Sequence, residues 1–232
     1  MNSLDVNKIA NELKNKSTIE IVEWAINYYK EDLGFMTALG SSGIVLLHHA
    51  LKISKNIQPY FIDTGFHFNE TMELLNKVQK FWKIEFQVLK PVISDNRLNE
   101  LIGEKPWETN PDICCHYRKV DPLLRVIHTK EIWMSALRRD QSTARAKLEV
   151  LELDGRGTLK IYPLVHWSYE EVWQYIRDNN LFYNELHDKN YPSLGCTHCT
   201  SPTKKGEHER SGRWNSMPKL ECGIHVNNLK KR

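Results

Sequence analysis

The chain contains five cysteines, and their spacing sets one apart from the other four. Four fall into two close pairs, the adjacent Cys114 and Cys115 and the C-x-x-C of Cys196 and Cys199, whereas Cys222 stands alone. Paired thiols are typical ligands of a metal ion or a metal–sulfur cluster, and a thiolate that is left over is a nucleophile. We therefore expect Cys222 to react with a small anionic substrate; the alternative is an incidental thiol.

The adjacent pair of cysteines indicates the kind of metal site. Neighbouring residues on a helix point about 100° apart, so two vicinal cysteines seldom share one compact tetrahedral zinc ion. An iron–sulfur cubane offers separate iron corners and can accept both. Spacing therefore favours a [4Fe-4S] cluster with the ligands Cys114, Cys115, Cys196 and Cys199. Zinc, a vicinal disulfide and a ligand role for His198 are the alternatives.

Composition is that of a soluble globular protein, with 41% hydrophobic and 26% charged residues in a chain of 232. A net charge of +3 is too small to indicate a nucleic-acid-binding protein. The longest apolar runs are too short to span a bilayer, and residues 1–16 lack the apolar core of a signal peptide. We expect a cytoplasmic protein, whose thiols stay reduced.

Hydrophobic patterning predicts an α/β fold with a mainly parallel sheet. Buried strands are expected over 35–39, 59–62 and 84–89, and helices over 44–53 and 69–81 separate them. Strands that alternate with helices form a parallel sheet with right-handed crossovers.

The rest of the chain adds to this sheet and then loses regular patterning. A further strand is expected over 132–137, a hairpin over 150–162 and a capped helix over 172–179. We expect residues 1–200 to form a nucleotide- and cluster-binding domain. The polar, glycine-containing residues 201–232 are expected to form a mobile catalytic segment that closes over a pocket.

Two turns follow the carboxyl ends of the first two predicted strands. Ligands of open parallel sheets bind beyond these ends, and a Gly/Ser turn that opens a helix favours a phosphate. The alternative for the first turn is a tight connection that needs glycine for its backbone alone. The predicted nucleotide contacts are Ser41, Ser42, Gly43, Asp63, Thr64 and Gly65.

Arg138 and Arg139 follow the predicted strand over 132–137, so they too point towards this pocket. Clustered basic residues of this kind suit a ligand that carries phosphate or sulfate. The alternative is that both arginines lie in an exposed surface loop.

Taken in order, these motifs resemble those of the assimilatory sulfonucleotide reductases, in the adenylyl-sulfate (APS) reductase branch that carries a [4Fe-4S] cluster. The resemblance rests on Leu39–Gly43, Asp63–Gly65, Cys114–Lys119, Leu137–Ser142, Gly195–Thr200, Glu207–Trp214 and Glu221–His225. The chain departs from the family's usual motifs at two places. His198 stands where the family usually has proline, and the sequence of Leu39–Gly43 is not the family's commonest one.

The resemblance implies an adenine nucleotide α-hydrolase-like, Rossmann-like fold and a reaction in two stages. The Cys222 thiolate would attack the sulfur of APS, release AMP and become S-sulfocysteine. Thioredoxin or glutaredoxin would then free sulfite, for cysteine biosynthesis. The cationic residues that match family positions around the sulfate are Lys119, Arg210, Arg213 and His225. Arg138 or Arg139 would assist at the phosphate.

Several alternatives remain at this point. The substrate could be the 3′-phosphorylated nucleotide PAPS, or both nucleotides, although family members without the four cluster cysteines are those that prefer PAPS. An ATP-pyrophosphatase-type ligase or tRNA-thiolating enzyme shares the Gly/Ser turn but leaves Glu221–His225 unexplained. A zinc-binding module without catalytic activity is a further alternative. The sequence does not determine the oligomeric state, and a homo-oligomer is one alternative.

Overall fold

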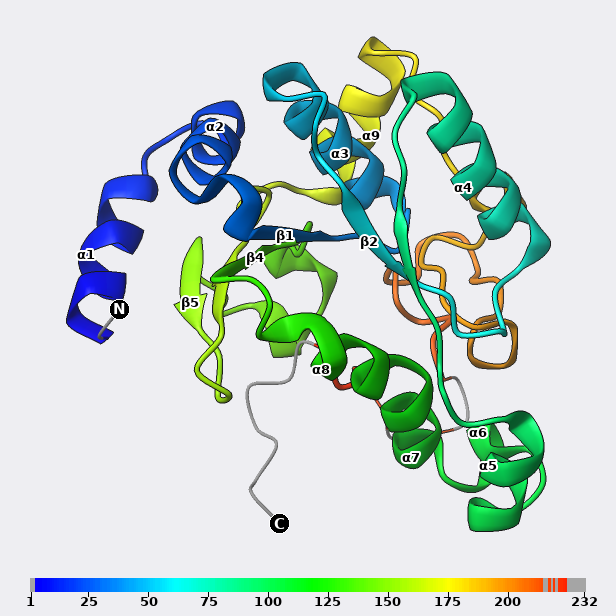
Figure 1. Ribbon diagram of the computed structural model, residues 1–232. Coiled ribbons are helices and arrows are strands. Elements are labelled where there is room, and N and C mark those ends of the chain that lie inside the picture. The colour runs from blue at the N-terminus through cyan, green and yellow to red at the C-terminus, as the bar shows by residue number, and fades with distance from the viewer. Residues whose placement is uncertain (1–2, 215–216, 218, 220, 225–232) are drawn as a thin grey trace.

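The computed structural model describes residues 3–214, 217, 219 and 221–224. Among them a six-stranded sheet has the order β3-β2-β1-β4-β6-β5 (Figure 1). The strands are β1 Leu33–Met36, β2 Pro59–Ile62, β3 Gln87–Leu89, β4 Ile132–Met134, β5 Leu151–Leu153 and β6 Leu159–Ile161. Only β5 is antiparallel to its neighbour. The predicted mainly parallel sheet and the predicted hairpin are confirmed, and the hairpin β5–β6 lies at one end of the sheet.

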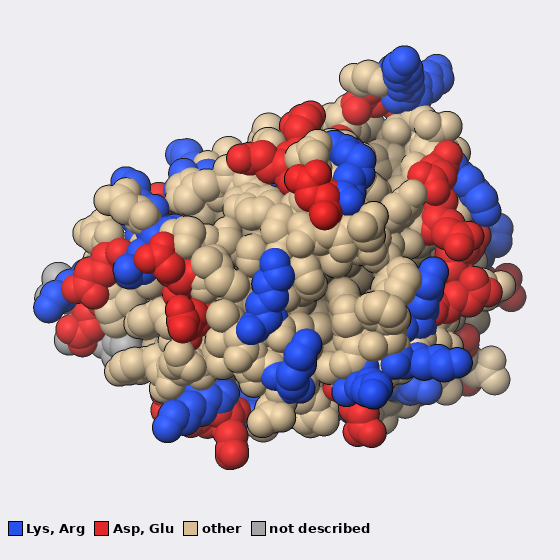
Figure 2. Space-filling model, turned by 90° about the horizontal axis from the view of Figure 1, so that it is seen from above, with Lys and Arg blue, Asp and Glu red and all other residues tan. Residues whose placement is uncertain are grey.

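Helices cover both faces of the sheet (Figure 1). The described helices are α1 Ser3–Leu13, α2 Thr18–Tyr29, α3 Ser41–Ile53, α4 Asn69–Trp82, α5 Asp95–Ile102, α6 Pro106–Thr109, α7 Pro111–Cys115, α8 Asp121–Ile127 and α9 Tyr169–Asp178. None of them is long and apolar enough to cross a membrane. On the face of the molecule seen in Figure 2, acidic and basic side chains are intermixed.

Strand side chains alternate between two hydrophobic cores, as the two-residue period of a strand requires. Phe61 of β2 and Met134 of β4 pack with α2, α3 and α9 in the larger core. Tyr60, Ile62 and Trp133 face the other way and pack with α8. The sheet is therefore buried on both faces, which explains why its strands read as continuous apolar runs in the sequence.

The predicted strand over 59–62 matches β2, and the one over 84–89 begins before β3. The predicted strands over 35–39 and 132–137 extend past the ends of β1 and β4, and at β1 the chain turns early towards α3. β1 ends at Met36, and the Thr37 hydroxyl accepts a hydrogen bond from the Leu39 backbone N–H at 3.0 Å. Leu39 has a positive φ of 56°. The next helix, α3, begins at Ser41 and not at Ile44. The Gly/Ser turn is therefore the first turn of α3 itself.

The backbone of Gly34 in β1 packs closely against the side chain of Trp133 in β4. A Cβ atom at this position would lie 2.6 Å from Cε3 of Trp133. Trp133 has little room to move, because it is buried and its indole N–H donates to the Ile127 carbonyl oxygen at 2.8 Å. We predict that Gly34→Ala lowers the free energy of unfolding by about 1–3 kcal/mol through overpacking, measured by urea denaturation.

A double-mutant cycle with Trp133→Leu tests the cause of this loss. The smaller side chain should accept the methyl group, so the double variant should lose less stability than the sum of the two single variants. Additive losses would contradict the collision.

Candidate active site

The carboxyl ends of β1, β2 and β4 open into a cavity of about 230 Å³. Predicted residues that line it are Ser41, Ser42, Gly43, Thr64, Lys119, Arg138, Arg210, Arg213 and Cys222. The structure thus brings together residues that are far apart in the sequence, at the edge of the sheet where the sequence places them. The predicted catalytic residue His225 lies outside the described residues.

The first turn of α3 presents a helix N-terminus to the cavity. Gly40 is its N-cap and supplies no side-chain oxygen to cap the first backbone N–H groups. Gly43 leaves no room for a side chain, because a Cβ atom there would collide with the Thr37 hydroxyl. Free N–H groups and the helix dipole together favour an anion at this place.

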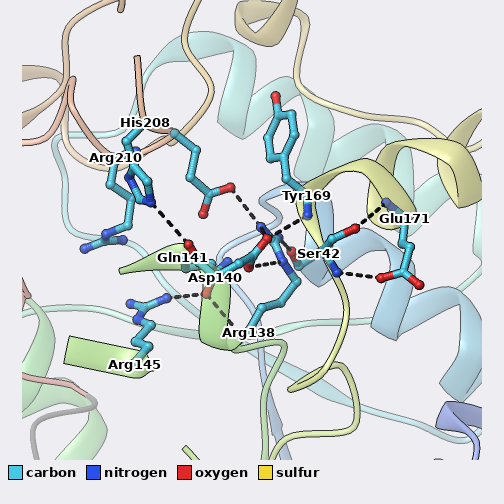
Figure 3. A network of polar contacts seen from close by, with 11 residues as sticks. Ser42, Arg138, Asp140, Gln141, Arg145, Tyr169, Glu171, His208 and Arg210 are labelled. Atoms are coloured by element: carbon cyan, nitrogen blue, oxygen red, sulfur yellow. Dashed lines mark hydrogen bonds and ion pairs between the residues drawn. The ribbon is translucent and has the colours of Figure 1, made fainter. Parts of the chain in front are cut away.

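Arg138 lies beneath this turn and is completely buried (Figure 3). Its Nη1 donates to the Ser42 hydroxyl, its Nε to Asp140 at 2.9 Å and its Nη2 to Glu209 at 2.9 Å. Asp140 also accepts a hydrogen bond from the Tyr169 backbone N–H at 2.7 Å. Arg138 therefore connects α3, the loop after β4, the start of α9 and the C-terminal segment.

Arg139, the next residue, is not among the residues that line the cavity. Its Nε donates to the Leu148 carbonyl oxygen at 2.6 Å, and its Nη2 forms an ion pair with Glu149 at 3.0 Å. The two predicted arginines thus have different surroundings, and the structure brings only Arg138 to the cavity.

Asp63 and Gly65 do not line the cavity either. The Asp63 carboxylate accepts the Gly65 backbone N–H at 2.9 Å, and Gly65 has a φ of 75° that favours glycine. These two residues shape the turn after β2, and Thr64 between them reaches the cavity.

The two cysteine pairs meet at a second, smaller cavity beside the first. Cys114, Cys115, Cys196 and Cys199 are free, buried and line it together. The Thr64 hydroxyl lies 3.4 Å from Cys196 Sγ. His198 stacks on Trp107, with ring centroids 3.7 Å apart. Within the described residues, no three His, Cys, Asp or Glu side chains are placed to hold a single metal ion.

A widened helical turn aims Lys119 between the two cavities. Residues His116–Val120 form a π-helical turn that joins α7 to α8 without a break in helical backbone. Pro122 lacks a backbone N–H, and its ring would collide with the carbonyl of residue 118 in a regular α-helix. Extra turns of this type occur often at functional sites. Here the turn buries Lys119, which lines both cavities.

Lys119 and the surrounding thiols shift one another's pKa values. Burial alone lowers the pKa of Lys119, but Cys196, Cys222 and Cys115 outweigh burial and raise it above its usual value. Burial acts in the opposite sense on Cys196, and Lys119 is the main group that reverses it, so that the pKa of this thiol is lowered. Cys115 has a pKa raised to about 12, chiefly by burial. The buried ammonium of Lys119 therefore favours the thiolate of Cys196.

Cys222 reaches the cavity because its neighbour Glu221 is held by arginines. Arg145 donates to both carboxylate oxygens of Glu221, from Nε at 2.8 Å and from Nη2 at 2.7 Å. Arg210 lies 3.3 Å from the same carboxylate. Burial and the positive charge of Arg145 lower the pKa of Arg210 to about 10.

Sequence reasoning missed Arg145 and Glu209 as residues of this site. Arg145 follows the carboxyl end of β4, the signal that singled out Arg138, and Glu209 lies inside the Glu207–Trp214 motif. A search of each loop at this edge of the sheet for every charged residue would have found both.

A parallel sheet with a helix N-terminus and a cationic cavity at its carboxyl edge defines a nucleotide-binding α/β enzyme class. Residues 33–202 match the phosphoadenosine phosphosulfate reductase domain, and the chain belongs to this family. An adenosine 5′-phosphosulfate reductase of Halalkalibacterium halodurans is 40% identical over 96% of this chain and 97% of its own length. The family resemblance that the sequence motifs indicated is confirmed.

Solved structures confirm the fold. A phosphoadenylyl-sulfate reductase from Candida auris is 30% identical, with a TM-score of 0.76 over 87% of this chain and 98% of its own. An FMN adenylyltransferase from Candida glabrata, 14% identical, has a TM-score of 0.59 over 82% of this chain and 66% of its own. The second likeness concerns the fold alone.

The neighbouring arginines Arg138 and Arg139 provide a matched test of the network in Figure 3. We predict that Arg138→Ala lowers the free energy of unfolding by about 3 kcal/mol or more, because it leaves Glu209 and Asp140 without their cation. Arg139→Ala removes a partly exposed ion pair and should cost less than about 1 kcal/mol. Urea denaturation measures both, and equal losses would contradict the assignment.

Proposed function

We propose that this protein is an APS reductase, which converts APS to sulfite and AMP with thioredoxin or glutaredoxin as the electron donor in assimilatory sulfate reduction. The observation that carries the proposal is the position of Cys222 in a cationic cavity that also contains the N-terminus of α3. Relatives that match nearly the full chain bear this name. Five free cysteines fit a reducing compartment, and we place the reaction in the cytoplasm.

The reaction begins when the Cys222 thiolate attacks the sulfur of APS. The bond between that sulfur and the bridging phosphate oxygen breaks, AMP leaves with the electron pair, and Cys222 becomes S-sulfocysteine. A thiolate of the donor then attacks Sγ of Cys222 and expels sulfite. The second thiol of the donor resolves the mixed disulfide, so the donor ends as a disulfide and Cys222 regains its thiolate.

Cationic groups must offset the repulsion between a thiolate and a phosphosulfate. We assign this role to Lys119, Arg210 and Arg213, which line the cavity with Cys222, and to His225 from its position in the family motif. The N-terminus of α3, at Ser41, Ser42 and Gly43, receives the phosphate.

The other residues predicted to contact the substrate have different roles in this proposal. Thr64 contacts the nucleotide, and Asp63 and Gly65 hold the turn that presents it. Arg138 acts on the phosphate through Ser42, to which it donates a hydrogen bond. The surroundings of Arg139 do not favour a substrate contact.

We propose that Cys114, Cys115, Cys196 and Cys199 hold a [4Fe-4S] cluster. The residues fit this group, because four free, buried thiols from two segments line one cavity beside a buried cation. The cluster, when bound, supplies electrostatic tuning of the sulfate site without cycling its redox state. Lys119 neutralises the thiolates on one side and faces Cys222 on the other.

Replacement of the nucleophile tests the first stage. We predict that anaerobic protein treated with APS, without reductant, gains a sulfonate-sized mass on Cys222, and that thioredoxin removes it. Cys222→Ser should gain no mass, and its rate of sulfite formation should fall about a thousandfold or more. Normal sulfite formation by this variant would disprove the mechanism.

The same assay distinguishes the substrates. The solved relative from Candida auris is named as a reductase of PAPS, so dual use is the second candidate function. If the adduct on Cys222 forms faster from APS than from PAPS, the proposal of an APS reductase is supported. If it forms faster from PAPS, the protein is a PAPS reductase instead.

Iron analysis tests the cofactor. We predict that Cys199→Ser, purified without air, loses most of the iron and acid-labile sulfide of the native protein. Lys119→Ala is the matched control: it should keep its iron, because an ammonium is no ligand, while turnover falls about a hundredfold. Zinc without sulfide in the native protein would contradict the cluster, and iron loss in Lys119→Ala would make Lys119 structural.

A further inference from the structure

We propose that Arg156, in the hairpin between β5 and β6, is a positioning residue that holds the segment Glu221–Ile224 and thereby keeps Cys222 in the cavity. Arg156 Nη2 donates to the backbone carbonyl oxygen of Ile224 at 3.1 Å. This hydrogen bond joins two parts of the chain that are 68 residues apart, two residues beyond the reactive thiol. This proposal rests on the proposed function, because it concerns how Cys222, the nucleophile of that reaction, is positioned.

Arg156 is oriented before the segment docks. Its Nε and Nη2 donate to Asp154 Oδ2 at 3.1 and 2.9 Å. Asp154 is buried, and its other oxygen accepts the backbone N–H groups of Arg156 and Thr158 at 2.9 and 3.0 Å. The guanidinium therefore has a fixed direction, and docking of the segment costs little further side-chain order.

The other contacts of the segment show that it is anchored on both sides of Cys222. Arg145 binds the Glu221 carboxylate before the thiol, and Arg156 binds the Ile224 carbonyl after it. The Ile224 side chain packs against the core between the sheet and α8. Between the anchors Gly223 turns the chain with a φ of 88°.

These anchors bear on the two stages of the proposed reaction in opposite ways. Attack on the substrate needs Cys222 inside the cavity, whereas a protein reductant needs the same sulfur to be accessible. A polar anchor at a backbone carbonyl is strong enough to favour docking and weak enough to be exchanged for water. Loss of Arg156 should therefore slow the first stage and speed the second.

Alkylation measures docking directly and needs no substrate. The probe is iodoacetamide, added to the substrate-free anaerobic protein, with labelling of the Cys222 peptide followed by mass spectrometry. We predict that Arg156→Ala raises the labelling rate of Cys222 about tenfold, the effect of one lost hydrogen bond from a charged donor. Glu221→Gln should raise it from the opposite anchor, and Arg156→Lys should restore part of the protection.

Arg177→Ala is the matched control, because Arg177 is exposed on α9 and donates to Gln174. It should label like the native protein. An unchanged labelling rate in Arg156→Ala would overturn the proposal, whatever the rate in Glu221→Gln. A merely structural role for Arg156 predicts that the other four cysteines also become labelled and that the thermal midpoint falls, and this result would overturn it too.

The two half-reactions complete the test. Arg156→Ala should release the first equivalent of AMP from APS more slowly, and should release sulfite from preformed S-sulfocysteine more quickly when thioredoxin is added. Equal slowing of both stages would contradict a positioning role. If the native protein releases no AMP at all, the proposed function fails, while the alkylation result still decides whether Arg156 docks the segment.

Discussion

The buried ammonium of Lys119 lies where three separate parts of the chain meet. Burying a cation is costly unless anionic or polar partners surround it. Thiols from the end of α7, from the C-x-x-C loop and from the C-terminal segment supply these partners, and they raise the pKa of Lys119 despite its burial. The three segments can therefore pack together only if Lys119 lies between them, and Lys119 keeps its charge only because their thiols surround it.

Arg138 has a corresponding role on the nucleotide side of the cavity. Its guanidinium is buried under the first turn of α3 and bridges two carboxylates, Asp140 and Glu209, that come from different loops. Neither Lys119 nor Arg138 is an exposed cation, because both are buried and have partners within the protein. The site is instead built from buried charges whose partners fix its walls, which is how an enzyme keeps its electrostatic field oriented before substrate arrives.

The sequence predicted the sheet, the turns at its carboxyl edge and the two cysteine pairs, because these depend on local patterning and on the parallel topology. It did not separate Arg138 from Arg139, since consecutive residues at the end of a strand point to opposite sides and only tertiary packing decides which side is the cavity. Asp63 was expected to contact the ligand, yet its carboxylate caps its own turn. The anchors Arg145 and Arg156 depend on contacts across 68 or more residues, which no local pattern contains.

The helical backbone runs without interruption from Pro111 to Ile127, through α7 and α8 (Figure 1). It joins the paired thiols of α7 to the hydrophobic core between the sheet and α8. A helix transmits displacement along its axis, and Leu123 and Ile127 at its far end pack against Trp133 of the central strand β4. A group that binds these four sulfurs only in the folded chain would be coupled to global unfolding by thermodynamic linkage. Occupancy would then set the lifetime of the folded chain against proteases as well as its chemistry.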